Sequence, residues 1–317
     1  MVEVISEDVV VSYWSGILPE VSYLHFLSFR VLNPNTKYVL YLEKDHDLNG
    51  TIPPLLSSKL ILLDIDIEVV ELTKLMDELG VPSFAVWKEN SFFRIARRVA
   101  RRFAPMLFAL GVRKHLFFSR TMGFTLSHNF PFSGFKTNLP YRSDLFRSLI
   151  HSRYEEKNFL YVDLDICFIK SCDFKAAPMG TIAQWGTSDF GNSAYLMLPT
   201  TARNAKRAIL NNLLHGVSAL PWILYNEERV TDYGLSIIDC AYLDPAWSPR
   251  SVIYQDSSLF FREGDHVQDF LQEVYERCLG VHWHNQWSVR PDAGSPYSLL
   301  VSHFENRLLA FHPSDVS

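Results

Sequence analysis

The sequence has few cysteines, no long apolar run and no excess of positive charge, and each of these absences excludes a class of protein. Its 317 residues include four cysteines and no C-x-x-C pair, so neither a disulfide scaffold nor a zinc knuckle is expected. No apolar stretch approaches the roughly 20 residues that a membrane-spanning helix needs. The 30 lysines and arginines are outnumbered by 35 acidic residues, and the net charge of −5 provides no overall field that attracts nucleic acid.

The start of the chain also lacks positive charge. Residues 1–8 contain Glu3, Glu7 and Asp8 but no Lys or Arg, which is the reverse of a secretory signal peptide. We therefore expect a protein that stays in the cytoplasm, where its thiols remain reduced and mostly buried. A hydrophobic content of 48%, with 14% aromatic residues, is sufficient for a globular core and argues against disorder.

Patterns typical of strands and helices alternate along the chain, and this alternation predicts an α/β fold built on a mostly parallel sheet. The expected strands are 9–14, 38–42, 60–67, 159–162, 180–185 and 194–198, and residues 251–261 are expected to form a further strand pair with the segment before them. The expected helices are 21–31, 67–79, 143–154, 202–214 and 267–278, the third of them capped by Ser143.

Residues 87–140 differ in character from the rest of the chain. At helical spacing, one face of this segment carries Arg94, Arg97, Arg98, Arg101 and Arg102, and residues 119–141 resemble irregular structure. A basic and aromatic amphipathic helix is typical of contact with an anionic membrane. The simpler interpretation is a solvated helix face that packs on the sheet, and the sequence leaves both open.

The most informative feature is a pair of acidic residues directly after an apolar strand. Asp163 and Asp165 follow the expected strand 159–162, and open α/β sheets bind ligands at the carboxyl ends of their strands. Two neighbouring carboxylates repel each other unless a cation or a proton lies between them, and Mg²⁺ sites commonly join carboxylates to phosphate oxygens. Asp64 and Asp66 have the same spacing, so the pair alone is not diagnostic.

The segment before Asp163 distinguishes it from the other pair. Asp144 and Arg147 lie three residues apart on an expected helix, and so on one helix face. A carboxylate and a guanidinium in this arrangement can pair or can jointly hold a polar ligand.

Three segments together resemble a known family, the glycosyltransferases with a DXD sugar-binding region. This group includes Och1-like mannosyltransferases and the glucosyltransferase domains of large clostridial cytotoxins. The resemblance is carried by YWSG at 13–16, by SDLFR at 143–147 with FLYVDLD at 159–165, and by HWHNQW at 282–287. These matches lie at the start, middle and end of the chain, in the order of the family.

The resemblance implies a single domain over 1–317 with a GT-A-type, Rossmann-like mixed sheet, helices on both faces and a basic helical insertion at 87–140. It also implies a metal-dependent, retaining hexosyltransferase that uses Mn²⁺ or Mg²⁺ and a UDP- or GDP-sugar. We expect a glycan or glycolipid acceptor, in bacterial surface polysaccharide or glycolipid synthesis, at the inner face of the membrane. No nucleic acid partner is expected.

By the same resemblance, individual residues receive expected roles. Asp165 would coordinate the metal that bridges the diphosphate, and Asp163 would contact the ribose or the metal. His282 would be a further metal ligand or a donor to the phosphates, while Asp144 and Arg147 would hold sugar hydroxyls. The other residues expected to line the donor site are Trp14 against the nucleobase, Ser143, Tyr161, Asp189, Asn192, Asn285 and Trp287.

Three other functions compete with this interpretation. The chain could be a glycosyltransferase effector that modifies a protein, or an inactive GT-A domain that only binds glycans. A phosphatase of the haloacid dehalogenase type also has a strand followed by D-x-D, and 264–269 imitates its later G-D-x-x-x-D acids. Against the phosphatase, its D-x-D normally lies near the N-terminus, whereas Asp163 lies deep in the chain.

Overall fold

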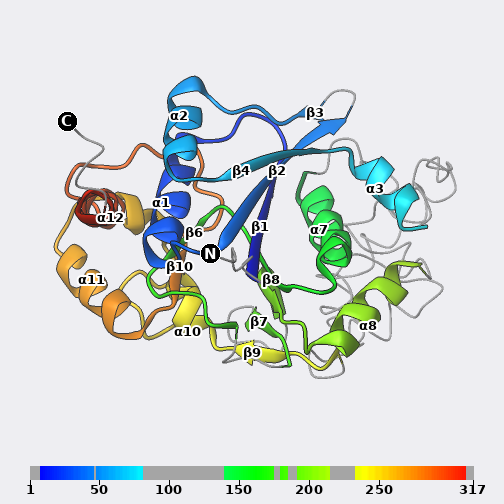
Figure 1. Cartoon of the computed structure of the whole chain (residues 1–317). Coiled ribbons are helices and arrows are strands. Elements are labelled where there is room, and N and C mark those ends of the chain that lie inside the picture. Colours follow the sequence, from blue (N-terminus) through cyan, green and yellow to red (C-terminus); the bar gives the residue numbers. More distant parts are fainter. Residues whose placement is uncertain are drawn as a thin grey trace, which may run out of the picture.

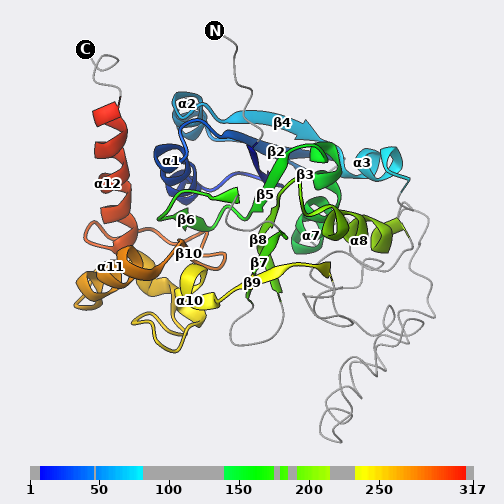
Figure 2. The same ribbon diagram turned by 60° about the horizontal axis from the view of Figure 1, so that its bottom comes forward.

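The computed structural model describes residues 8–45, 48–80, 139–174, 179–184, 191–214 and 233–311. The expected basic helix at 94–102, nearly all of the 87–140 insertion, and Asp189 lie outside the described residues. The described part is built around one large sheet with helices on both of its faces (Figures 1 and 2). This confirms the predicted α/β class.

The main sheet has eight strands in the order β3-β2-β1-β5-β8-β7-β9, with β4 also paired to β2. Its strands are β1 (Asp8–Trp14), β2 (Lys37–Asp45), β3 (Leu48–Asn49), β4 (Asp66–Val70), β5 (Asn158–Val162), β7 (Thr181–Gln184), β8 (Gly191–Leu198) and β9 (Ser236–Ile238). The strands β4, β2, β1 and β5 are mutually parallel, whereas β8 runs antiparallel to both β5 and β7. The sheet is therefore mixed. A separate antiparallel ribbon joins β6 (Ile166–Phe168) to β10 (Gly280–His282).

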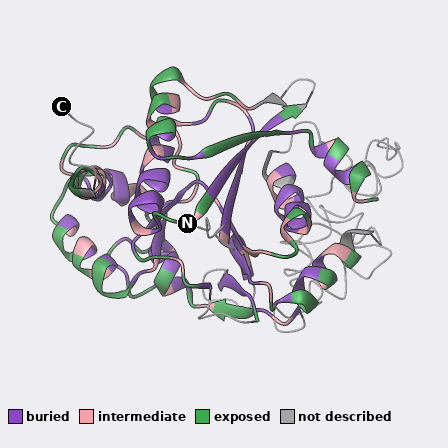
Figure 3. Cartoon of the chain, in the orientation of Figure 1, coloured by how far each residue is buried: buried purple, intermediate pink, exposed green. Residues whose placement is uncertain are grey.

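Helices cover both faces of the sheet because its central strands are apolar on both sides. In β1, Val10 belongs to one core cluster, while Val9 and Val11 belong to the other, as the alternation of side chains along a strand requires. The first cluster packs against α1 (Tyr23–Leu32), α2 (Pro54–Leu62), α11 (His266–Arg277) and α12 (Pro296–Phe311). The second packs against α3 (Leu72–Glu78), α7 (Leu139–Ile150) and α8 (Arg203–Leu214). Figure 3 shows the central strands buried and the outer helix faces exposed.

Three local predictions are wrong: the strand at 60–67, the start of the helix at 143–154 and the strand pair at 251–261. Residues 60–67 do not form a strand, because Leu56, Leu60 and Leu63 are buried at helical spacing within and just after α2, and the strand β4 starts only at Asp66. As a result, α3 begins at Leu72 rather than at 67.

The helix predicted at 143–154 begins earlier, at Leu139, so Ser143 lies inside α7 and does not cap it. Residues 251–261 form turns and a 3-10 helix, Ser257–Phe261, instead of a strand pair. The remaining expected elements are present with shifted ends, and all four cysteines are free thiols, as predicted. Among the described helices, none combines the length and apolar character needed to cross a bilayer.

Candidate functional site at the carboxyl ends of β1 and β5

The two acidic pairs lie at opposite edges of the sheet. Asp163 and Asp165 follow the carboxyl end of β5, beside the carboxyl end of its parallel neighbour β1. Asp66 is instead the first residue of β4, which runs parallel to β2, as β2 does to β1. It therefore lies at the amino ends of these strands, where its carboxylate pairs with Lys37 at 2.9 Å on the surface. The structure therefore separates the two copies of the same motif, and only the Asp163 copy meets other candidate residues.

Arg147 on α7 joins the first acid of the pair to its own helix. Its Nη2 lies 3.1 Å from Asp163 Oδ1 and 3.4 Å from Asp144 Oδ1, and its Nη1 donates to Ser193 Oγ at 2.9 Å. The guanidinium is buried with two carboxylates and a hydroxyl around it, which compensates for removing its charge from water. Arg147 thus fixes α7 against the ends of β5 and β8.

Ser143 and Tyr161 form hydrogen bonds to Arg147 and Asp163. The hydroxyl of Tyr161 donates to Asp163 Oδ1 at 2.8 Å, and Ser143 Oγ accepts from Arg147 Nη2 at 2.9 Å. Tyr161 is completely buried, so it positions Asp163. Both residues were predicted to line the site; Tyr161 contacts Asp163 directly, whereas Ser143 contacts Tyr161 and Arg147.

The second acid of the pair faces the C-terminal part of the chain. Asp165 is almost fully buried, its Oδ1 lies 3.3 Å from His282 Nε2, and its Oδ2 accepts the backbone N–H of Asn285 at 2.7 Å. The backbone N–H of Trp283 also donates to the carbonyl of Asp165 at 2.9 Å. Asp163 and Asp165 therefore have different partners, although one residue separates them.

The surroundings give these carboxyl groups different pKa values. Burial raises the pKa of Asp144 to about 7, although the charge of Arg147 opposes the shift. Burial and the charge of Asp165 likewise raise the pKa of Asp163, against the effect of Arg147. The pKa of Asp165 is lowered, because the charge and hydrogen bond of His282 and the N–H of Asn285 outweigh its burial. At neutral pH Asp165 is the firmly charged member of the set.

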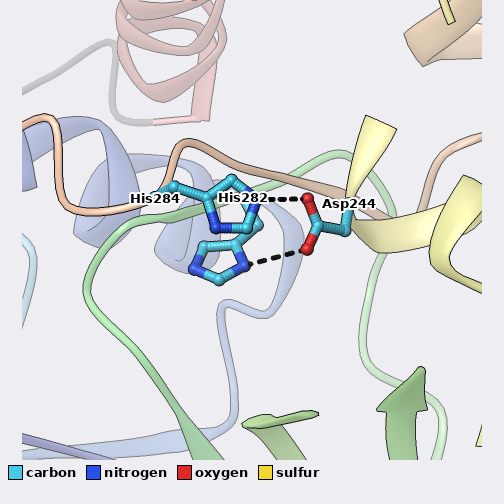
Figure 4. A group of neighbouring side chains, drawn as sticks. All are labelled: Asp244, His282 and His284. Carbon is cyan, nitrogen blue, oxygen red and sulfur yellow. Dashed lines mark hydrogen bonds and ion pairs between the residues drawn. The ribbon is translucent and has the colours of Figure 1, made fainter. Parts of the chain in front are cut away.

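His282 lies between two carboxylates. Its Nδ1 is 3.4 Å from Oδ2 of Asp244, which follows the short helix α10 (Cys240–Leu243), and His284 Nε2 lies 2.5 Å from Asp244 Oδ1 (Figure 4). Burial alone would lower the pKa of His282, but the charges of Asp165 and Asp244 raise it well above its ordinary value. Asp244 is not among the residues predicted from the sequence, because a single acid directly after a short helix has no distinguishing pattern. The only sequence feature that points to this group is the H-x-H spacing of His282 and His284.

The aromatic residues expected at the two ends of the chain meet at this edge. Trp14, the last residue of β1, packs edge to face against Trp287, with ring centroids 4.9 Å apart. The indole Nε1 of Trp14 is buried and has no acceptor among the described residues. Trp287 Nε1 donates to Asn285 Oδ1 at 3.0 Å, so the loop after β10 connects the aromatic pair to Asp165.

Asn192 is the second residue of β8, and its Oδ1 accepts the backbone N–H of Ala194 at 3.0 Å. This contact suits a residue that shapes the start of the strand, next to the Ser193 that holds Arg147. The acids at 265 and 269, which imitate a phosphatase motif, are exposed at the start of α11.

The donor set at Asp165 fits a divalent ion. Two ligands of one such ion lie roughly 3 Å apart, close to the 3.3 Å between Asp165 Oδ1 and His282 Nε2. A charged carboxylate and an imidazole are both acceptable ligands for a divalent first-row ion.

Comparison with known proteins gives resemblance only at the level of solved structures. No family model matches the chain, and no curated protein matches it. The glycosyltransferase GlyE of Streptococcus pneumoniae TIGR4 is 12% identical, with a TM-score of 0.40 over 98% of this chain and 64% of that one. Mouse xyloside xylosyltransferase 1, in its apo form, is 10% identical, with a TM-score of 0.37 over 89% and 99% of the two chains.

The galactosyltransferase LgtC, in complex with donor and acceptor sugar analogues, is 9% identical, with a TM-score of 0.36 over 94% of this chain and 95% of that one. Because identities and TM-scores are this low, no residue role is transferred from these structures.

Proposed function

We propose that this chain is a metal-dependent glycosyltransferase of the GT-A fold, which moves a hexose from a UDP- or GDP-sugar to a glycan acceptor with retention of configuration. The observation that carries the proposal is that residues from separate segments of the chain meet at one site. Asp144 with Arg147, Asp163 with Asp165, and His282 come from three distant segments and lie in one connected network at the carboxyl edge of the sheet. These are the residues that the sequence resemblance selected, before any contact between them was known.

In this proposal Asp165 and His282, with Asp163, hold Mn²⁺ or Mg²⁺ against the diphosphate. Such an ion stabilises the negative charge that develops on the leaving nucleoside diphosphate. Arg147 is already engaged by two carboxylates, and its contribution is to hold Asp163 and Asp144 in place.

The remaining roles follow from position. Asp144 is about one-quarter exposed and can accept a hydroxyl of the transferred sugar. Trp14 and Trp287 offer apolar ring faces for a nucleobase, and Asn285 lies beside the diphosphate position. We further propose Asp189 and Asn192 as sugar-side residues, on the sequence pattern.

We also propose that the chain forms one domain over 1–317, in which residues 87–140 are an insertion that faces the acceptor or a membrane. The arginine-rich helix at 94–102 would then contact anionic lipid at the inner membrane face, with a bacterial glycolipid or surface glycan as the acceptor. These points rest on composition, since the segment lies outside the described residues.

The test is hydrolysis of nucleotide sugars without an acceptor, measured with Mn²⁺, with Mg²⁺ and with neither. We expect hydrolysis to require one of the ions and to fall at least about 100-fold in Asp165→Ala, because the ion loses its charged ligand. Asp66→Ala is the matched control, since it removes an acid of the same D-x-D spacing at the other edge of the sheet.

Three outcomes would count against the proposal. Hydrolysis that persists without metal, or that survives in Asp165→Ala, contradicts the site. Binding of a nucleotide sugar without any turnover, with or without a glycan acceptor, would instead indicate an inactive glycan-binding domain.

A further inference from the structure

A second group of potential ligands lies next to Asp165 and is not used by the proposed reaction. It consists of Asp244, His282 and His284, whose ligand atoms all lie within 4.8 Å of one another (Figure 4). His282 is shared, because its Nε2 faces Asp165 and its Nδ1 faces Asp244. The group therefore borders the reaction site but is directed away from it.

Local structure explains why the two imidazoles lie together. His282 ends β10, and the chain turns just after it, so the rings of His282 and His284 lie with centroids 4.1 Å apart while Trp283 is buried in the core. His284 and Asn285 then have φ values of +49° and +57°, in the left-handed region that costs non-glycine residues free energy. Trp247 stacks on His284, with centroids 4.8 Å apart and planes 10° apart, and this contact fixes the ring.

The carboxylate of Asp244 is the third member, and its side chain is 2% exposed. Oδ1 contacts His284 Nε2, whereas Oδ2 is buried and has no hydrogen-bond partner among the described residues. Its ion-pair contact, His282 Nδ1, is 3.4 Å away, which is longer than a well-formed N–H···O bond. A contact of this length compensates a buried carboxylate oxygen only in part, and a cation bound between these atoms would compensate it more fully.

We propose that Asp244, His282 and His284 form a binding site for a zinc-class divalent ion, separate from the ion expected at Asp165. Two imidazoles and one carboxylate are a ligand set that Zn²⁺ favours, whereas Mg²⁺ prefers oxygen ligands alone. His282 Nδ1 and His284 Nε2 are the nitrogens that face the site.

The shared histidine couples this site to the reaction site. A neutral imidazole has one lone pair, so a ring that binds zinc through Nδ1 carries its proton on Nε2. That proton then points to Asp165, and His282 can no longer serve as a ligand there. Zinc at the new site therefore weakens binding of Mn²⁺ at Asp165.

The first experiment measures Zn²⁺ binding to the full chain by calorimetry, with no nucleotide sugar present. We expect one site in the wild type, and at least a 10-fold loss of affinity in Asp244→Asn and in His284→Gln. His303→Ala is the matched control, since His303 lies on α12 outside the cluster and is expected to leave the affinity unchanged. Co²⁺ bound in place of Zn²⁺ should give visible absorption bands that His284→Gln abolishes.

Unchanged Zn²⁺ affinity in His284→Gln would overturn the site, because this side chain is partly exposed and its loss is compatible with folding. The second experiment titrates Mn²⁺ by electron paramagnetic resonance, with and without Zn²⁺. Weaker Mn²⁺ binding in the wild type, but not in His284→Gln, supports the shared histidine, and an unaffected titration overturns the sharing. Both readouts are independent of glycosyl transfer, so zinc binding in an inactive protein would refute only the proposed function.

Discussion

Three carboxyl groups at one sheet edge have different pKa shifts because each has different neighbours. Asp165 is paired with a histidine and a backbone N–H, so its pKa is low. Asp144 is nearly as close to Arg147 as Asp163 is, yet its burial dominates and its pKa rises to about 7. At physiological pH Asp144 is therefore partly protonated and can donate as well as accept a hydrogen bond.

The pH dependence of stability should reveal this group. Because the folded pKa of Asp144, about 7, lies above the ordinary value of 3.8, the folded state binds the proton more tightly. The contribution of Asp144 to stability therefore falls as pH rises from about 4 to 7 and is level above that. In Asp144→Asn this fall is absent, so the variant should gain about 2–3 kcal/mol relative to wild type between pH 5 and pH 8.

Urea unfolding at several pH values measures this difference. Asp77→Asn, on the exposed side of α3, controls for the loss of one negative charge. A difference between Asp144→Asn and wild type that stays constant from pH 5 to pH 8 would contradict the raised pKa.

The limits of sequence reasoning are clearest at individual residues. Asp163 and Asp165 could be chosen over Asp64 and Asp66 because motif neighbours accompany them, and the structure places the two pairs at opposite sheet edges. Asp244 could not be chosen, since its significance arises only when the end of α10 meets β10 in three dimensions.

Helix α7 connects the candidate site to the sheet through a second buried ion pair. Arg142, which is 1% exposed, pairs with Glu43 of β2, and its Nε donates to Glu43 Oε2 at 2.9 Å. The hydroxyl of Tyr13 donates to the same carboxylate. Arg142 and Arg147 thus place α7 on two strands, and the orientation of Asp144 depends on both contacts.

Removing one partner of this pair should be costly. In Arg142→Met the carboxylate of Glu43 stays buried without its counter-ion, and we expect a loss of about 3–5 kcal/mol in the free energy of unfolding. The double variant Arg142→Met with Glu43→Leu should recover more than half of this loss, because well-packed apolar residues can replace a buried pair.

The exposed pair between Arg153 and Glu78 provides the comparison, with its two charged atoms 2.9 Å apart. Arg153→Met should cost less than about 1 kcal/mol, because solvent screens the pair. Chemical denaturation of the three variants checks the ranking, and equal losses in Arg142→Met and Arg153→Met would refute it.

At the scale of elements, periodicity predicted the long, strongly patterned segments and failed where patterns overlap. The strand β5 is a short continuous apolar run and the helix α11 is apolar at helical spacing, and both are found. The apolar residues of α2 are followed almost at once by those of β4, so the two patterns merge into one apolar run. The boundary between the helix and the strand was therefore misplaced. The start of α7 was missed because the polar residue Ser143 resembled a cap.

At the scale of the molecule, the candidate site is assembled from the first strand, the middle of the chain and the segment after β10. Trp14 meets Trp287, and Asp165 meets His282 and Asn285. The order of the motifs was visible in the sequence, but their convergence depends on β5 inserting beside β1 and on the pairing of β10 with β6. A ligand that contacts all three segments stabilises the whole fold, since no single segment forms the site.

This arrangement predicts that a nucleotide sugar and Mn²⁺ together protect the entire chain from thermal unfolding. A ligand that binds only the folded state at about 100 times its Kd adds about 2.7 kcal/mol, which corresponds to a rise in Tm of about 5 °C. A thermal-shift panel of UDP- and GDP-sugars measures the rise and identifies the nucleotide. The shift should require the ion, disappear in Asp165→Ala and persist in Asp66→Ala, because only the first variant removes an acid from the site. An equal rise without any divalent ion would show that the nucleotide binds elsewhere, or binds without the metal that Asp165 and His282 are proposed to hold.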